Sequence, residues 1–183
     1  MQPEDSASGP DIVTIVRELA GAGIRYVLAG SVAAAAYGVA VQPRDLDIVP
    51  DLKSENLTRL AALLRRWGAK PMPDPDWPES LTPEECDRWA PDPPTWENLD
   101  HLMRTPHGLL DIVPTRARPY QDLILRAITI VFEGGSIRIA HPRDLIFPLR
   151  MYKAKHQARL PQLNAICERL EGGENITPRL PCR

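Results

Sequence analysis

The chain has 183 residues, of which 43 % are hydrophobic, and its formal net charge is −2. This length suffices for one sizeable core with a small helical appendage and leaves little room for two full domains. No run reaches the roughly 18 apolar residues of a membrane span, and residues 1–11 lack the pattern of a secretion signal, so we expect a cytoplasmic protein without a membrane partner.

The charges are divided unevenly along the chain. Residues 1–100 carry 9 Lys and Arg against 17 Asp and Glu, whereas residues 101–183 carry 13 against 7. An acidic front half suits metal chemistry and a basic back half suits a phosphate-bearing partner, although solvated surface alone produces such asymmetry. The three cysteines are widely spaced and lack the grouping of a zinc site.

The first elements lead to a glycine at a strand-to-helix turn. Residues 12–19 have the spacing of an amphipathic helix, and residues 25–29 form a short apolar strand. Gly30-Ser31 follows this strand directly and precedes the alanine-rich helix 32–36. A glycine and a serine at a helix start offer close backbone approach, free N–H groups and a hydroxyl to a phosphate, although a tight turn explains the same pair.

The segment 43–50, PRDLDIVP, alternates polar and apolar residues as a half-buried strand does. Asp45 and Asp47 then point to the same face, about 6–7 Å apart at Cα. Capping or a salt bridge to Arg44 is the alternative for Asp45. Residues 57–64 then have the spacing of a helix, and Trp67-Gly68 marks its expected end.

Residues 71–94 contain eight of the twenty prolines, which predicts a Pro/Trp-rich insertion over about 70–98 without long regular elements. A strand over 109–113 follows the turn 106–108 and places Asp111 in its middle. Residues 121–127 are expected to be helical, and 128–139 form a hairpin with a glycine turn. Prolines then divide the remainder into helices 142–147, 148–158 and 161–171.

Three carboxylates therefore have the distribution of a divalent metal site. Asp45 and Asp47 share a strand face, and Asp111 on a neighbouring strand would lie about 5 Å away. Such hard oxygen ligands suit Mg²⁺ or Mn²⁺, and two ions about 3.5–4 Å apart serve phosphoryl transfer. The sequence predicts a metal site of Asp45, Asp47 and Asp111.

The arrangement of GS, 13 residues, DLD and a later strand with a lone Asp resembles the DNA polymerase β-like nucleotidyltransferase superfamily over residues 11–113. The runs LMRTPHGLLDIVP and HPRDLI are similar to the AbiEii-type branch, which includes toxins of toxin–antitoxin systems, and extend the likeness to about residue 170. The resemblance implies an α/β (α+β) fold: a mixed sheet with flanking helices in a core over 11–140, a C-terminal helical region over 141–171, and flexible tails at 1–10 and 174–183.

The resemblance also implies a Mg²⁺-dependent enzyme that transfers a nucleoside monophosphate from an NTP to an acceptor hydroxyl. Gly30 and Ser31 would bind the triphosphate, Asp45 and Asp47 both metals, and Asp111 one metal and the attacking hydroxyl. Relatives often carry a helix Lys followed by a Gly-Arg-x-Lys-Asp run, which this chain lacks, so either Lys153 or Lys155 could contact the triphosphate.

Three functions remain open at this stage. A toxin-like enzyme would modify an RNA 3′ end, most naturally that of tRNA, and a cognate antitoxin protein would be a partner. Transfer to a small molecule or a protein hydroxyl is the second, and a catalytically degenerate binding or antitoxin module is the third. The arginines and lysines of the back half serve an RNA acceptor or merely form the solvated side of helices.

Overall fold

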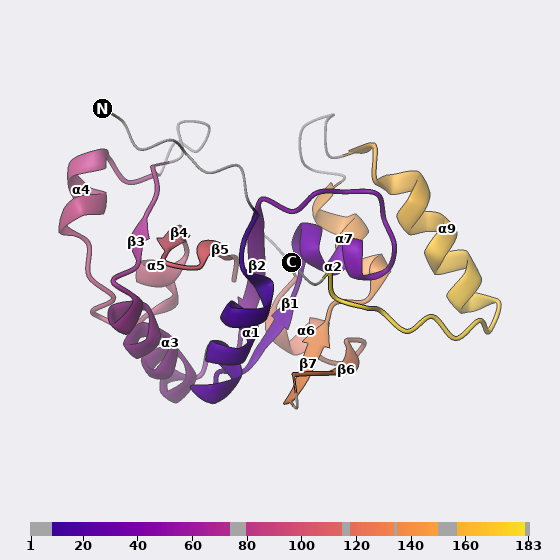
Figure 1. Cartoon of the computed structure of the whole chain (residues 1–183), viewed down its shortest axis with the longest axis horizontal. Coiled ribbons are helices and arrows are strands. Elements are labelled where there is room, and N and C mark those ends of the chain that lie inside the picture. The colour runs from indigo at the N-terminus through magenta and orange to yellow at the C-terminus, as the bar shows by residue number, and fades with distance from the viewer. Residues whose placement is uncertain (1–8, 74–79, 115–117, 134, 150–156, 182–183) are drawn as a thin grey trace.

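The computed structural model describes residues 9–73, 80–114, 118–133, 135–149 and 157–181. A mixed seven-stranded sheet in the order β3-β4-β5-β2-β1-β7-β6 runs through these parts of the chain, with helices packed around it (Figure 1). The predicted mixed sheet with flanking helices is confirmed. The strands are β1 (Tyr26–Leu28), β2 (Asp45–Pro50), β3 (Lys70–Pro71), β4 (Leu102–Thr105), β5 (Gly108–Ile112), β6 (Ile128–Phe132) and β7 (Gly135–Ile139).

The helices of the described residues are α1 (Ile12–Gly21), α2 (Gly30–Ala36), α3 (Ser54–Trp67), α4 (Pro83–Arg88), α5 (Trp96–Leu99), α6 (Tyr120–Leu123), α7 (Pro142–Leu149) and α9 (Leu160–Glu171). Helices and strands alternate from α1 to β3, after which α4 and α5, β4 and β5, and β6 and β7 each follow one another directly. Among the described residues, none of these helices has the length and apolar character needed to cross a membrane.

The centre of the sheet is built from β2, which pairs antiparallel with β1 and parallel with β5. Leu46 and Ile48 of β2 and Leu110 of β5 are fully buried, because they point into the main core. The apolar stripe of α1 enters the same core. An ion pair between Glu18 of α1 and Arg66 of α3, 2.6 Å long, connects the two helices at the surface.

The sheet is wider than the sequence indicated. The run 102–105 forms β4, and Lys70–Pro71 forms the edge strand β3, so the insertion expected from about residue 70 begins only after β3. Both strands are too short to show a clear alternation and are held by pairing with their neighbours. The rest of the described insertion contains only the short helices α4 and α5.

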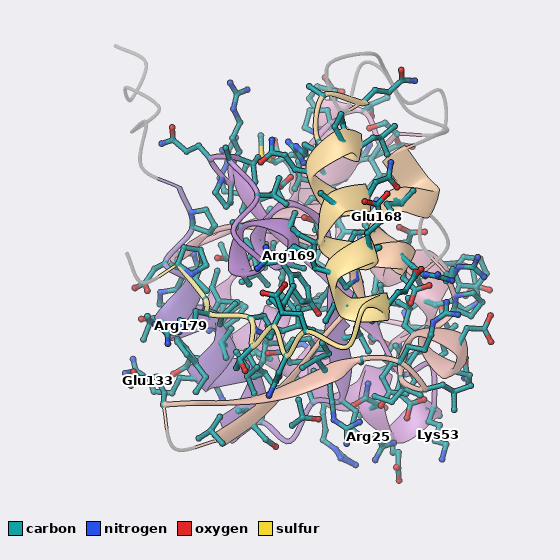
Figure 2. All side chains as sticks on the ribbon, turned by 90° about the vertical axis from the view of Figure 1, so that its right-hand side faces the viewer. Arg25, Lys53, Glu133, Glu168, Arg169 and Arg179 are labelled. Atoms are coloured by element: carbon teal, nitrogen blue, oxygen red, sulfur yellow. The ribbon has the colours of Figure 1, made fainter. Side chains whose placement is uncertain are left out.

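The C-terminal region packs helix against helix. The predicted break before Pro148 is wrong, because α7 continues through this residue and ends at Leu149. Helix α9 lies beside α7 at the outer end of the molecule, and Figure 2 views it from that side, with Glu168 and Arg169 labelled.

Residues after α9 return to the body of the protein. The backbone N–H of Arg179 donates a hydrogen bond of 2.8 Å to the carbonyl of Ala36, at the end of α2, and Leu180 is buried. Over residues 174–181 this docked course differs from the flexible tail expected over 174–183, since burial of Leu180 ties the segment to the core.

Candidate metal and nucleotide site

The three predicted aspartates come together on one face of the sheet. The parallel register of β2 and β5 places Asp47 directly opposite Asp111, and Asp45 lies two residues earlier on β2. Carboxylate oxygens of the three side chains lie within 4.8 Å of one another. The structure therefore brings together two carboxylates on one strand and a third beside them.

The face that carries the aspartates is more open than the opposite one. Asp45 and Asp47 are half-buried, and Asp111 is 8 % exposed, whereas Leu46 and Ile48 between and beyond them are 0 % exposed. Three carboxylates so close together and partly withdrawn from water repel one another unless positive charge compensates them. The triad therefore has the electrostatic character of a cation site.

The chemistry of these ligands selects the kind of cation. Carboxylate oxygens without nitrogen or sulfur donors suit Mg²⁺ or Mn²⁺, which bind such oxygens at about 2.1 Å. Two oxygens bound to one such ion are at most about 4.2 Å apart, so the observed spacing needs only a small adjustment of the side chains. The residues present fit a divalent metal site.

Gly30 lies against this triad in a conformation that only glycine adopts easily. Its φ is +59°, and a Cβ atom at this position would lie 1.8 Å from Asp47 Oδ2. The preceding N–H of Ala29 donates a hydrogen bond of 3.0 Å to the backbone carbonyl of Asp47. The start of α2 and the carboxylate of Asp47 are thus in direct contact, which no residue with a side chain at position 30 would allow.

Ser31 occupies the first turn of α2. Its side chain is 7 % exposed, and among the described residues its Oγ is buried without a hydrogen-bond partner. No side chain in the described part of the chain caps α2. The first N–H groups of a helix are not used within the helix, and they carry the positive end of its dipole, so this corner of the triad is suited to anionic oxygens.

Lys153 and Lys155, the two candidates for contact with the triphosphate, lie outside the described residues. The structure therefore positions Gly30, Ser31 and the three aspartates, and it leaves the choice between the two lysines as it stood.

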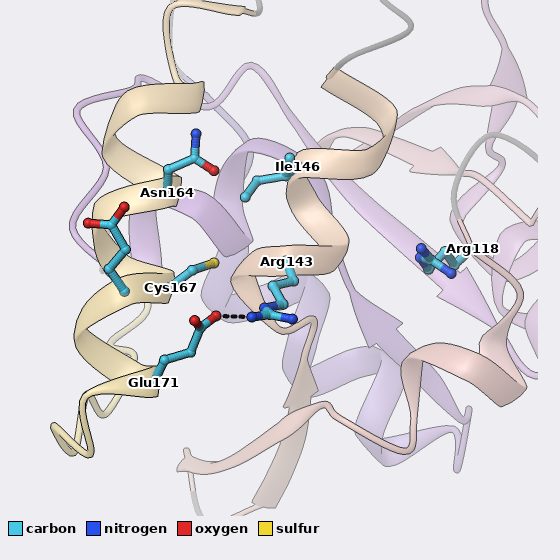
Figure 3. A pocket seen from close by; sticks show the side chains of 7 residues that line it. Arg118, Arg143, Ile146, Asn164, Cys167 and Glu171 are labelled. Atoms are coloured by element: carbon cyan, nitrogen blue, oxygen red, sulfur yellow. Dashed lines mark hydrogen bonds and ion pairs between the residues drawn. The ribbon is translucent and has the colours of Figure 1, made fainter.

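A separate cavity of about 470 Å³ lies between α7 and α9 and is lined by residues such as Ile146, Asn164 and Cys167 (Figure 3). An ion pair between Arg143 and Glu171 crosses it, as the dashed line in Figure 3 shows. Burial raises the pKa of the Cys167 thiol, so this cysteine is uncharged at neutral pH. The cavity contains none of the aspartates.

Asp144 of α7 is a buried acid to which sequence reasoning assigned no role. Its side chain is 1 % exposed and forms ion pairs with Arg118 and Arg126. These arginines precede α6 and β6, so the acid attaches α7 to both. The sequence signal was an Asp in the first turn of a helix, a position that ordinary capping also explains.

Comparisons with known proteins give weak likenesses. No protein-family model and no curated protein matches the chain. Among solved structures, the antibiotic-resistance factor ANT(2'')-Ia is similar with 14 % identity and a TM-score of 0.47, over 88 % of this chain and 91 % of that one. An antigenic nucleotidyltransferase-like protein from Paracoccidioides brasiliensis is similar with 15 % identity and a TM-score of 0.34, over 93 % of each chain. At TM-scores below 0.5 these likenesses do not establish a shared fold, and the proposal below depends on the geometry of the site.

Proposed function

We propose that the protein is a metal-dependent nucleotidyltransferase that moves a nucleoside monophosphate from an NTP to an acceptor hydroxyl. The observation that supports this most is the meeting of Asp45, Asp47 and Asp111 within 4.8 Å, with Gly30 at the start of a helix against Asp47. In a metal–triphosphate complex, a carboxylate cluster can bind the metal and the free N–H groups at a helix start beside it can bind the phosphates. The order of these residues also resembles the DNA polymerase β-like superfamily, as the sequence indicated.

Each residue has a role in this proposal. Asp45, Asp47 and Asp111 would hold Mg²⁺ or Mn²⁺, which would neutralise charge on the reacting phosphate oxygens. Gly30 and Ser31 bind the β- and γ-phosphates through the start of α2. A carboxylate oxygen of Asp111 accepts the proton of the acceptor hydroxyl. The hydroxyl oxygen then bonds to the α-phosphorus, the bond to the β-phosphate breaks, and pyrophosphate leaves.

We further propose that the acceptor is the 3′ end of an RNA, most naturally tRNA, and that the enzyme acts as a toxin. The excess of 13 basic over 7 acidic residues in positions 101–183 supports a partner with many phosphates. The likeness of LMRTPHGLLDIVP and HPRDLI to the AbiEii-type branch supports the toxin role. Under this proposal a cognate antitoxin protein would neutralise the activity.

Transfer of label tests the proposal. The protein is incubated with each α-³²P-labelled NTP, Mg²⁺ and total tRNA, and the RNA is separated by electrophoresis. We expect incorporation from at least one NTP, and a loss of roughly 100-fold or more in Asp47→Ala, because metal coordination contributes several kcal/mol to such a transition state. Equal incorporation by the wild type and Asp47→Ala would contradict the proposal.

The destination of the label and the binding of NTP distinguish the other functions. Label found in a small molecule or a protein, with none in RNA, would keep the chemistry and reject the RNA acceptor. A protein that shows no rise in melting temperature with any NTP and Mg²⁺ binds none of them at the concentration used, which would indicate a degenerate binding or antitoxin module.

A further inference from the structure

The face of the sheet that carries the triad continues beyond it across three strands. In the ladder, Asp45 pairs with Leu109 of β5, Leu109 pairs with Arg104 of β4, and Arg104 pairs with Lys70 of β3. Residues directly opposite each other in neighbouring strands point to the same face. Arg104 and Lys70 therefore lie on the triad face, in the row that begins at Asp45.

This extension of the triad face is accessible. Leu102 and Leu109 are half-buried, and Arg104 and Lys70 are exposed. On the opposite face of the same strands, Met103 is 0 % exposed. The triad face of β5, β4 and β3 is thus an open surface with an apolar floor and two cations.

The cations are positioned for an anion. The ammonium of Lys70 donates hydrogen bonds to the carbonyls of Asp87, 2.7 Å, and Trp89, 2.9 Å, which hold it in place on the strand paired with that of Arg104. Arg104 and Lys70 line a groove of about 400 Å³ at the corner of the sheet, together with Trp67 and the carboxylate-bearing Asp87. A guanidinium offers paired N–H donors that match phosphate oxygens.

The in-line geometry of phosphoryl transfer indicates on which side of the triad the acceptor lies. The attacking and leaving oxygens lie on opposite sides of the phosphorus. Gly30 follows β1, which neighbours β2 on one side, whereas β5, β4 and β3 lie on the other side. If the triphosphate occupies the start of α2, the acceptor approaches over Leu109 and Arg104. This step rests on the proposed function.

We infer that Arg104, assisted by Lys70, binds a backbone phosphate of a single-stranded RNA acceptor whose terminal hydroxyl reaches Asp111. Arg104 lies two strands from Asp45, about 10 Å at Cα, so the phosphate it holds belongs to a nucleotide upstream of the reacting end. The half-buried Leu109 between the two provides an apolar surface for the intervening nucleoside.

Binding of a short fluorescent single-stranded RNA with a free 3′ hydroxyl, measured by anisotropy at several salt concentrations, tests this inference. For Arg104→Gln we expect a dissociation constant raised about tenfold and a salt dependence reduced by about one phosphate contact. Arg104→Lys keeps the positive charge without the paired N–H donors, so its affinity for the RNA should fall less than that of Arg104→Gln. The rise in melting temperature with NTP and Mg²⁺ should stay as in the wild type for both variants.

Arg65→Gln is the matched control. Arg65 is exposed in the last turn of α3 and lies two residues before Trp67, so it points to the opposite side of the helix from the groove. This variant makes the same charge change and should bind the RNA within about twofold of the wild type. Equal binding by Arg104→Gln and Arg65→Gln would overturn the inference.

The failure of this inference is distinguishable from that of the proposed function. If Asp47→Ala loses label transfer while Arg104→Gln has an unchanged KM for RNA, the RNA subsite at Arg104 is rejected and the proposed enzyme activity is retained. Arg104-dependent RNA binding without any label transfer would keep the subsite and contradict the enzyme. Transfer to a protein acceptor, without RNA binding, would overturn the RNA subsite.

Discussion

The contact between Gly30 and Asp47 is the most demanding feature at the scale of single residues. The glycine combines a left-handed φ of +59° with a position that leaves no space for a Cβ atom beside the carboxylate. Most glycines in turns satisfy only the first of these conditions. Here the backbone of Gly30 approaches the Asp47 side chain, which we assign to metal binding, so a substitution at position 30 would both strain the backbone and displace this carboxylate.

Gly30→Ala should separate these two effects. The new methyl group would displace the carboxylate of Asp47, so we expect at least a 100-fold loss of label transfer and a destabilisation of about 1–3 kcal/mol from the left-handed backbone and the clash. Denaturation curves and transfer rates measure the two quantities. Gly23→Ala is the control, because Gly23 has a similar φ of +65° and a Cβ added there would lie 4.0 Å from its nearest neighbour, Arg59 Cδ. Gly23→Ala should lose stability but keep transfer; equal losses of transfer in both variants would contradict a specific role for Gly30.

The predictability of single residues from the sequence depends on how local their environment is. The spacing of Gly30-Ser31 and Asp45-Leu46-Asp47 is a local pattern, and Asp111 was the one acid expected in the middle of a later strand. The position of Arg104 on the triad face could not be predicted, because it depends on the register of β4 against β5. The burial of Asp144 beneath two arginines is likewise a tertiary property.

At the scale of elements, the start of α7 depends on His141. Its carbonyl accepts the N–H of Asp144 at 2.8 Å, and its Nδ1 accepts the N–H of Arg143 at 3.3 Å. Only a neutral imidazole offers Nδ1 as an acceptor, and a protonated ring would place positive charge at the positive end of the helix dipole. Burial accordingly lowers the pKa of His141 below its usual value of 6.5.

This gives a stability difference that depends on pH. Because the pKa of His141 is lower in the folded protein than in the unfolded chain, the unfolded chain takes up the proton first as the pH falls. The stability that neutral His141 contributes to the folded protein is therefore complete above about pH 6.5 and is lost as the pH falls below it. His141→Asn keeps a helix-capping acceptor that does not titrate. Urea denaturation at about pH 7.5 and 5.5 should show that the wild type loses about 0.5–1 kcal/mol more than the variant. An equal loss in both proteins would show that His141 does not titrate in this range.

The longer elements followed their sequence patterns, whereas the shortest strand, β3, did not. Helices α1 and α3 have a complete apolar stripe, and β2 has a clear alternation, so their positions were predictable to within a few residues. Strand β3 has two residues and exists because β4 lies beside it. Pro148 was expected at a helix start, because a proline inside a helix removes a backbone hydrogen bond, yet α7 includes this residue.

At the scale of the whole molecule, the acidic front half and the basic back half acquire a partial structural meaning. The triad combines two acids of the front half with Asp111 from the back half, on adjacent strands at the centre of the sheet. Several back-half cations are engaged in ion pairs: Arg118 and Arg126 with Asp144, Arg143 with Glu171, and Arg169 with Glu174. Part of the basic excess therefore serves the packing of the helical region, so charge counts alone overstated the surface available to RNA.

The central claim is that Asp45, Asp47 and Asp111 form one divalent metal site, and binding of Mn²⁺ observed by electron paramagnetic resonance tests it most directly. With a non-hydrolysable NTP analogue present, the wild type should bind Mn²⁺ and quench its free signal. Asp47→Asn and Asp111→Asn should weaken this binding by roughly 10–100-fold or more, whereas Asp122→Asn, a change at an exposed acid of α6, should leave it intact. Binding of Mn²⁺ that is the same in all four proteins would contradict the claim.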